Sequence, residues 1–397
     1  MNANVEFDEI RPYYDEELPQ IYEELIADAA FREAVSRVMP GVPFEQIAQQ
    51  MRACKTKLAF QKAFSYNLIQ NIIKKATDGV TLDHTALPDE GKNFTYISNH
   101  RDIILDSGFL SVLLVDVGLD TPEIAIGNNL LIYPWIKKLV RINKSFIVQR
   151  GLSMRQMLES SIRMSTYMHF VIHTKKQSIW IAQREGRAKD SDDRTQESVL
   201  KMLAMGGEGS VIDRLMEMNI APTALSYEYD PCDYLKAWEF QLKRDNPEYK
   251  KSTTDDLLNM KTGLFGYKGH VHFRPGTCIN DELSRMDNTL PKTELFARIS
   301  ALIDKRIHSN YKMYPNNYVA HDLLEGNDNF ASHYTPEDRE RFLSYLEKQL
   351  GRIEIVDKDE SFLREKMLLM YANPLKNYLA ATKEFLCLKS EVTDNRR

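Results

Sequence analysis

The sequence predicts an α/β protein with a mixed, mainly parallel central sheet flanked by helices, and with helical regions at both ends of the chain. Between about residue 92 and residue 275, short apolar segments with strand character alternate with segments of helical periodicity. This alternation is typical of a sheet whose strands are connected by covering helices. Outside that stretch the apolar residues recur at helical spacing, which predicts the two terminal regions.

Residues 1–85 are expected to form the helical N-terminal region. In residues 44–75, FEQIAQQMRACKTKLAFQKAFSYNLIQNIIKK, apolar residues recur at helical spacing with basic residues between them. Residues 291–397 are expected to form the helical C-terminal region. There Thr335 is a good N-cap, and Pro336 suits the first helical position that follows it.

The α/β domain is predicted to span residues 86–290. Its strands are expected at six apolar segments: FTYIS (94–98), EIAIG (123–127), SFIVQ (145–149), SIWIA (178–182), TALSY (223–227) and HVHFR (270–274). The polar segment near residues 236–262 interrupts this pattern, and we interpret it as an insertion.

Composition limits the classes of function. The chain has 397 residues, 43% of them hydrophobic and 27% charged, as in an ordinary folded protein. A net charge of −5 argues against a general nucleic-acid binder. The cysteines lie far apart without a CxxC pair, so they predict neither a zinc site nor a disulfide framework and fit a reducing cytoplasm; they are Cys54, Cys232, Cys278 and Cys387. The start of the chain lacks the layout of a signal peptide, and no apolar run is long enough for a transmembrane helix.

The segment SNHRDIILDSGFL (98–110) contains the strongest catalytic candidate. His100 lies just after an expected strand, and Asp102 and Asp106 follow within six residues. A carboxylate can orient a histidine ring and stabilise its imidazolium form, so that the histidine can take a proton from a hydroxyl. The chain has no GxSxG elbow and no cysteine in a recognisable nucleophile context. We therefore predict direct attack by a hydroxyl of the substrate.

Polar residues also follow other expected strands. A glycine lets a ligand approach the backbone closely, while arginine and lysine suit a phosphate. Each loop alone could be an ordinary solvated loop, but their recurrence at successive strand ends predicts one shared site. The residues, in chain order, are Arg150, then Glu185, Gly186, Arg187 and Lys189, and finally Tyr227 with Glu228.

In this order the segments resemble the glycerolipid acyltransferase family, in particular its glycerol-3-phosphate acyltransferase branch. The family's Asn/Cys-His, four-residue spacer and Asp is matched here by Asn99-His100 with Asp106. The likeness covers roughly residues 93–230. Its remaining blocks are IAIGNNLLIYPWIKKLVRINKSFIVQR (124–150), which is the most specific, WIAQREGRAK (180–189) and IAPTALSYEYDP (220–231).

Two departures from the family pattern concern the site. Five residues, not four, separate His100 from Asp106. We favour Asp106 as the partner of His100, with Asp102 as the alternative, which could instead cap a helix. The third block is one residue short, so either Arg187 or Lys189 could occupy the family's arginine position.

The resemblance implies that His100 acts as general base on an acceptor hydroxyl, which attacks the thioester of an acyl-coenzyme A or an acyl-carrier protein. The acyl donor is a co-substrate, and no cofactor and no metal are expected. Glu185 would order its loop, and backbone N–H groups near Gly186 would stabilise the oxyanion. The other expected substrate-binding residues are Asn99, Arg101 and the phosphate-holding Arg150, Arg187 and Lys189.

Peripheral contact with the inner face of the cell membrane is expected for a cytoplasmic enzyme with a lipid product. In LLIYPWIKKLVRINK (130–144), aromatic residues lie beside cations, a pattern that suits anionic headgroups. The alternative is a helix that covers the sheet with its cations exposed. The basic amphipathic segment at residues 52–75 is a second candidate surface.

The sequence leaves three functions open. The first is transfer of a fatty acyl group to glycerol 3-phosphate in phospholipid synthesis. The second is transfer to lysophosphatidate or another lipid hydroxyl. The third is a non-catalytic protein that binds an acyl donor or a lipid, which the extra residue before Asp106 favours.

Overall fold

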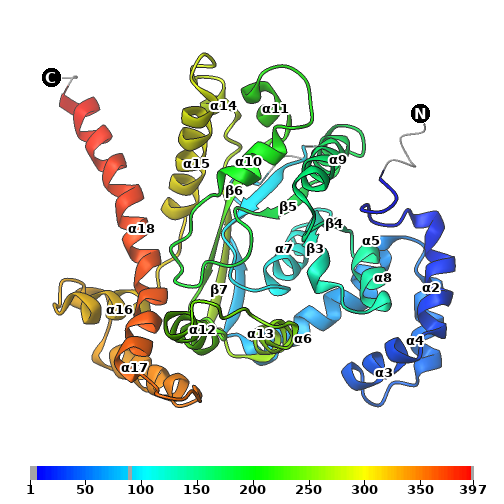
Figure 1. Cartoon of the computed structure of the whole chain (residues 1–397), viewed down its shortest axis with the longest axis horizontal. Coiled ribbons are helices and arrows are strands. Elements are labelled where there is room, and N and C mark those ends of the chain that lie inside the picture. The colour runs from blue at the N-terminus through cyan, green and yellow to red at the C-terminus, as the bar shows by residue number, and fades with distance from the viewer. Residues whose placement is uncertain (1–6, 88–91, 395–397) are drawn as a thin grey trace.

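The computed structural model of the protein describes residues 7–87 and 92–394, and a seven-stranded sheet runs through its middle. The N-terminal helices lie at one side of the sheet and the C-terminal helices at the opposite side (Figure 1). Neighbouring strands run parallel in every pair except β6 and β7. The predicted fold class, a mixed and mainly parallel sheet flanked by helices, is thereby confirmed.

The strand order is β1-β7-β6-β2-β5-β3-β4. All six expected strands form, and β1 is an additional strand inside the region expected to be helical. Its sequence, GVTL, is too short to stand out as a strand, and it pairs with β7. The strands are β1 (Gly79–Leu82), β2 (Thr95–Ser98), β3 (Glu123–Gly127), β4 (Ser145–Val148), β5 (Ile179–Ala182), β6 (Ile220–Tyr227) and β7 (His270–Pro275).

Helices connect the strands and make up the terminal regions. Those before β2 are η1 (Asp15–Glu17), α2 (Leu18–Ala27), α3 (Ala29–Val38), α4 (Phe44–Ala53), α5 (Lys57–Phe60), η2 (Gln61–Ser65) and α6 (Tyr66–Ala76). Those between β2 and α15 are α7 (Leu105–Asp116), η3 (Asn128–Leu130), α8 (Pro134–Ile142), α9 (Met154–His173), α10 (Glu197–Leu203), α11 (Val211–Glu217), α12 (Asp233–Asp245), α13 (Thr253–Phe265) and α14 (Asn280–Leu283). The last are α15 (Lys292–Ser309), α16 (Pro315–Glu325), η4 (Ala331–His333), α17 (Pro336–Leu350) and α18 (Glu360–Asp394).

Successive side chains along the central strands enter two different cores, because they point to opposite faces of the sheet. Tyr96 and Trp180 pack with α6 and α7 on one face. Ile97, Ile179 and Ile181 pack with α9, α10 and α15 on the other. Both faces are thus covered, which explains why these strands are apolar throughout.

The polar segment near residues 236–262 is largely helical, and its interpretation as an insertion stays a prediction. It forms most of α12 and α13. Leu235 and Ala237 of α12 are buried in the same core as Phe342 of α17 and Leu363 of α18, so this segment connects the sheet to the C-terminal helices. The domain boundaries themselves stay a prediction.

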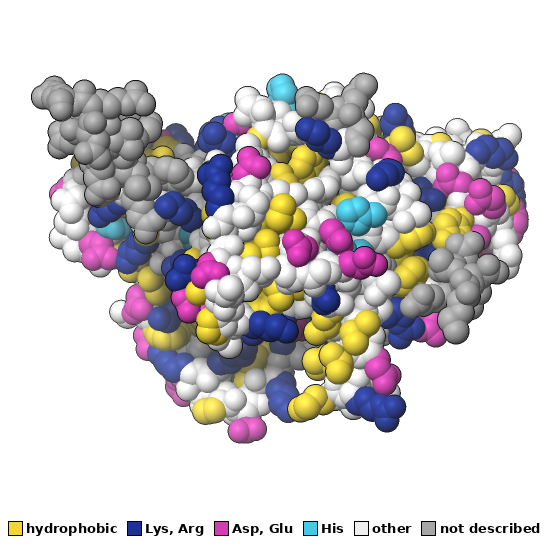
Figure 2. Space-filling model, turned by 90° about the horizontal axis from the view of Figure 1, so that it is seen from above, with side chains coloured by type: hydrophobic (Ala, Val, Ile, Leu, Met, Phe, Trp, Pro, Cys, Tyr) yellow, Lys and Arg dark blue, Asp and Glu magenta, His cyan; other side chains and the backbone are white. Residues whose placement is uncertain are grey.

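Two of the four cations expected to be exposed at and just after α8 lie inside the protein. Arg141 and Lys144 are buried, where Arg141 donates to the carbonyl of Arg11 and Lys144 pairs with Asp120. On the face in Figure 2, basic and acidic side chains are intermixed. Among the described residues, none of the helices is both long and apolar enough to cross a membrane.

Candidate active site

The carboxyl ends of the parallel strands open into a cavity of about 1360 Å³. Such ends meet at one edge of a sheet, and this is where α/β proteins place their ligands. Six of the expected site residues line the cavity: His100, Arg150, Glu185, Gly186, Arg187 and Lys189. The other expected residues do not line it; they are Asn99, Arg101, Asp102, Asp106, Tyr227 and Glu228.

His100 is held by Asp106. The Nδ1 atom of His100 lies 2.7 Å from Oδ2 of Asp106, whose side chain is fully buried. The same carboxylate oxygen accepts backbone N–H groups from Arg101 and Asp102. A turn at residues 103–104 precedes α7 and places Asp106 in the first turn of that helix. With Nδ1–H donated to Asp106, the Nε2 atom of His100 is left to accept a proton.

Tyr227 and Trp180 complete the surroundings of this pair. The Tyr227 hydroxyl donates to Oδ1 of Asp106 at 2.9 Å. Burial, with the nearby charge of Asp106, raises the pKa of Tyr227 well above its ordinary value, so the hydroxyl stays a donor. The His100 and Trp180 rings meet edge to face at 5.8 Å. Tyr227 ends the strand next to β2, and this position is the signal that identifies it in the sequence.

Asp102 has a different role. Its Oδ1 atom accepts the backbone N–H groups of Ile104 and Leu105, at 2.9 and 2.7 Å, where α7 begins. Burial and the charge of Asp106 raise the pKa of Asp102. Of the two candidate carboxylates, therefore, Asp106 contacts His100 and Asp102 caps the following helix.

Asn99 and Arg101 support the loop of His100 from inside the protein. The Asn99 amide exchanges two hydrogen bonds with the backbone of Leu225 in β6. Arg101 contacts both carboxylate oxygens of the buried Asp193, at 2.8 and 2.6 Å. Neither side chain lines the cavity, and their contact with substrate stays a prediction.

The loops after β4 and β5 meet at the cavity. Arg150 pairs with Glu185 at 3.3 Å, and the backbone N–H of Glu185 donates to Gln196. Gly186 has a φ of 69°, in the left-handed region that favours glycine. The conformation of this loop therefore depends on a glycine at the position where the backbone borders the cavity.

Arg187 and Lys189 differ in the contacts that their side chains make within the protein. One terminal nitrogen of Arg187 donates to Asn259 of α13 at 3.0 Å, and the other, Nη1, has no hydrogen-bond partner among the described residues. Lys189 pairs with Glu239 of α12, and burial lowers its pKa to about 8. Arg187 is thus the better placed of the two to hold an anionic ligand.

Helix α13 packs directly against the loop that contains His100 and Asp102. A Cβ atom at Gly263 would collide with Oδ2 of Asp102. Substitution of Gly263 by Ala is expected to lower the free energy of unfolding by about 1 kcal/mol, because overpacking costs about 1–3 kcal/mol and the gain in helix propensity offsets part of it. Chemical denaturation measures this, with Lys261→Ala, an exposed position of α13, as control. An unchanged or raised stability would contradict the contact.

The rest of the cavity is lined by apolar side chains with polar ones among them, and one of its walls follows α7. Ser107, Ser111 and Val115 line it and recur every fourth residue, so they share one face of the helix. Because α7 begins beside His100, the cavity extends from the histidine along about 12 Å of that helix. Its other apolar walls include Ile69, Ile72, Ile124, Ile126, Leu139 and Trp180.

Comparisons with known proteins add little to this geometry. No family model matches the sequence, and neither does any curated protein. Among solved structures, the chain is similar to the crystal structure of the 1-acyl-sn-glycerophosphate (LPA) acyltransferase, PlsC, from Thermotoga maritima, with a TM-score of 0.35 and 10% sequence identity. The match covers 75% of this chain and 97% of that chain. A likeness at this score carries no argument about function.

Proposed function

We propose that the protein is an O-acyltransferase that moves a fatty acyl group from a thioester of coenzyme A or acyl-carrier protein to the hydroxyl of glycerol 3-phosphate. The observation that carries the proposal is the combination in one cavity of a carboxylate-held histidine, an arginine nitrogen without a partner among the described residues, and a long, mostly apolar extension. The histidine would supply the base, the arginine would contact the phosphate, and the extension would hold the acyl chain.

In the proposed reaction, Nε2 of His100 takes the proton of the acceptor hydroxyl while Nδ1–H donates to Asp106. The hydroxyl oxygen attacks the thioester carbonyl and forms a tetrahedral oxyanion. Backbone N–H groups of the loop at Gly186 are our candidates for stabilising it. When the intermediate collapses, the C–S bond breaks and the imidazolium returns the proton to the thiolate, so the products are an ester and a free thiol.

Arg187 is our candidate for the phosphate contact. It borders the cavity, and its guanidinium can bind phosphate oxygens in a bidentate manner. Arg150, paired with Glu185 at the exposed rim, would help to attract the anion. Lys189 would contribute mainly through its charge, since Glu239 already holds it.

The acyl chain would lie along α7. Replacing Ser111 by Phe fills this part of the cavity, and we expect turnover with a palmitoyl thioester to fall at least tenfold while turnover with an octanoyl thioester changes little. A series of thioesters of rising chain length measures this. Val117→Phe, at the exposed end of α7, is the control and should leave the profile unchanged. An equal loss at every chain length would contradict this placement of the acyl chain.

The acceptor is identified by release of free thiol from palmitoyl-coenzyme A and from palmitoyl-acyl-carrier protein. Glycerol 3-phosphate, lysophosphatidate and no acceptor are compared. We expect release that depends on glycerol 3-phosphate; release that depends on lysophosphatidate instead would identify the alternative acceptor. Donor binding without release in any mixture would favour a non-catalytic acyl-donor-binding protein.

Membrane contact stays a prediction, which co-flotation with anionic vesicles would test.

A further inference from the structure

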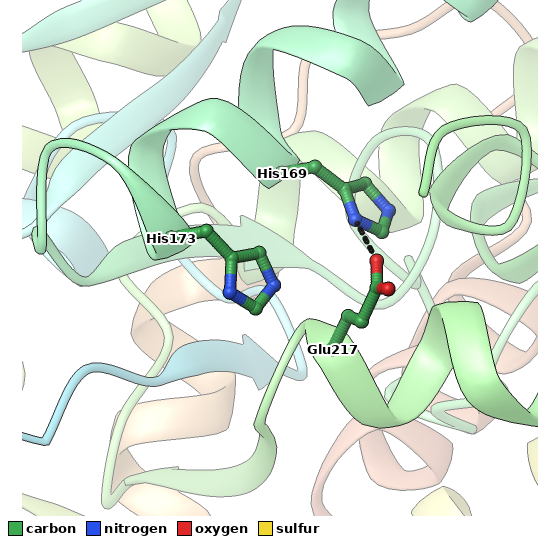
Figure 3. A group of neighbouring side chains, drawn as sticks. All are labelled: His169, His173 and Glu217. Atoms are coloured by element: carbon green, nitrogen blue, oxygen red, sulfur yellow. Dashed lines mark hydrogen bonds and ion pairs between the residues drawn. The ribbon is translucent and has the colours of Figure 1, made fainter. Parts of the chain in front are cut away.

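Three side chains with metal-binding chemistry lie together at the sheet edge opposite the cavity. His169 and His173 are in the last turns of α9, and Glu217 ends α11 (Figure 3). Helix α9 leads into β5 and α11 leads into β6, so the cluster lies near the amino ends of the two strands that flank β2. None of the three residues has a part in the proposed reaction.

The two histidines and the glutamate point toward a common space. Residues four apart lie on one face of a helix, so His169 and His173 are neighbours. The Nδ1 atom of His169 lies 2.9 Å from Oε2 of Glu217, and one candidate ligand atom from each of the three side chains lies within 4.8 Å of the others. His169 is buried, Glu217 is half-buried and His173 is exposed, which leaves the cluster open on one side.

The hydrogen bonds of His169 fix the state of its ring. Nε2 lies 3.1 Å from the carbonyl oxygen of Leu203, which also accepts from the hydroxyl of Ser165. A carbonyl can only accept, so Nε2 carries the hydrogen, and Nδ1 of a neutral ring is then a lone pair. That lone pair faces the carboxylate of Glu217, a second acceptor. Either a second proton on the ring or a metal cation between the two atoms removes the repulsion.

Two observations favour the metal. Metal-binding histidines usually donate their other ring N–H to a carbonyl or carboxylate, as Nε2 does here. His173 brings a second imidazole to the same space, which a simple ion pair between His169 and Glu217 would not need. Two imidazoles and one carboxylate form a known ligand set for zinc. We propose that His169, His173 and Glu217 bind a divalent transition metal of the zinc class, with water as fourth ligand.

The surroundings allow this. Zinc at its usual bond lengths would place the Nδ1 and Oε2 atoms about 3.3 Å apart, so Glu217 needs to move by less than about 0.5 Å from His169. The exposed His173, whose ligand atom lies within 4.8 Å of the other two, would move toward them. The space exists because residue 207 is glycine: a Cβ there would collide with Oε2 of Glu217 and lie 2.9 Å from Nδ1 of His169. Gly207 has a φ of 76°, which a larger residue rarely adopts. The metal would therefore join α9 to α11 beneath a glycine loop and stabilise the fold.

The test uses the full chain, freed of metal with a chelator and then titrated with zinc sulfate. We expect one zinc per chain and a rise in Tm of at least about 2 °C. His173→Ala, a change at an exposed position, should weaken zinc binding at least tenfold and remove the rise in Tm. The matched control is His270→Ala, which alters the other metal-type cluster of the described residues, Asp78, Glu228 and His270, and should change neither result.

Glu217→Gln and cobalt provide a second, independent readout. Bound cobalt(II) in a tetrahedral site has visible absorption, which should appear with the wild-type chain and be lost in both His173→Ala and Glu217→Gln. If the wild-type chain holds no zinc, or if His173→Ala binds it as tightly as the wild type, the proposal is wrong. His169 would then carry a second proton on its ring and form an ion pair with Glu217.

Discussion

His100→Ala is expected to lower kcat for acyl transfer by about 100- to 10,000-fold, the usual contribution of a general base. The imidazole is the only part of the site that we assign to take the hydroxyl proton, and a methyl group cannot replace it. Binding of the acyl thioester should persist, because the apolar extension of the cavity along α7 does not depend on His100. Steady-state kinetics with a parallel measurement of donor affinity checks both points.

The matched control for this variant is His84→Ala, a change at an exposed histidine in the loop after β1. Its kcat should equal that of the wild type. If His100→Ala retained turnover within a few-fold of the wild type, another group would have to be the base, and the assignment of this histidine would fail.

Asp106→Asn is expected to lower kcat by roughly 10,000-fold, because an amide cannot stabilise the imidazolium and favours the wrong tautomer of the ring. Asp106 accepts hydrogen bonds from four donors: His100, Tyr227 and the backbone N–H groups of Arg101 and Asp102. An amide NH₂ in place of one oxygen leaves some of these donors unsatisfied. The free energy of unfolding should therefore fall as well, by about 1–3 kcal/mol.

Asp102→Asn distinguishes the role of Asp102 from that of Asp106. Asparagine is as good a helix cap as aspartate, so it keeps an oxygen for the N–H groups of Ile104 and Leu105. The kcat of this variant should stay within a few-fold of the wild-type value. Its free energy of unfolding should stay within about 1 kcal/mol of that of the wild type. Equal losses of kcat in Asp102→Asn and Asp106→Asn would show that the loop as a whole matters and not the contact with His100.

Local pattern was sufficient to predict six of the seven strands. Strands such as IWIA at β5 are apolar throughout because helices cover both faces, and that pattern is visible in a single sequence. The position of His100 directly after β2 likewise indicated the edge where the cavity lies. Strand β1 escaped prediction because its four residues form a strand only by pairing with β7, which lies almost two hundred residues away in the chain.

The surroundings of the site depended on contacts that no local pattern contains. Asn259 and Gly263 reach the site only because α12 and α13 fold back over the carboxyl edge of the sheet. The cations of α8 look like a membrane-facing set in the sequence, but Arg141 is buried through hydrogen bonds to the backbone of Asp8 and Arg11. His169 and Glu217 belong to different helices, α9 and α11, so no local pattern could predict their contact.

The most direct test of the central claim follows a labelled palmitoyl group from palmitoyl-coenzyme A into ester product with glycerol 3-phosphate, for the wild type and His100→Ala side by side. We expect label in acylglycerol phosphate only when the acceptor is present, and at least 100-fold less product per unit time from the variant. Label that stays in the thioester with the wild type, although the donor binds, would contradict this expectation. So would equal product from both proteins.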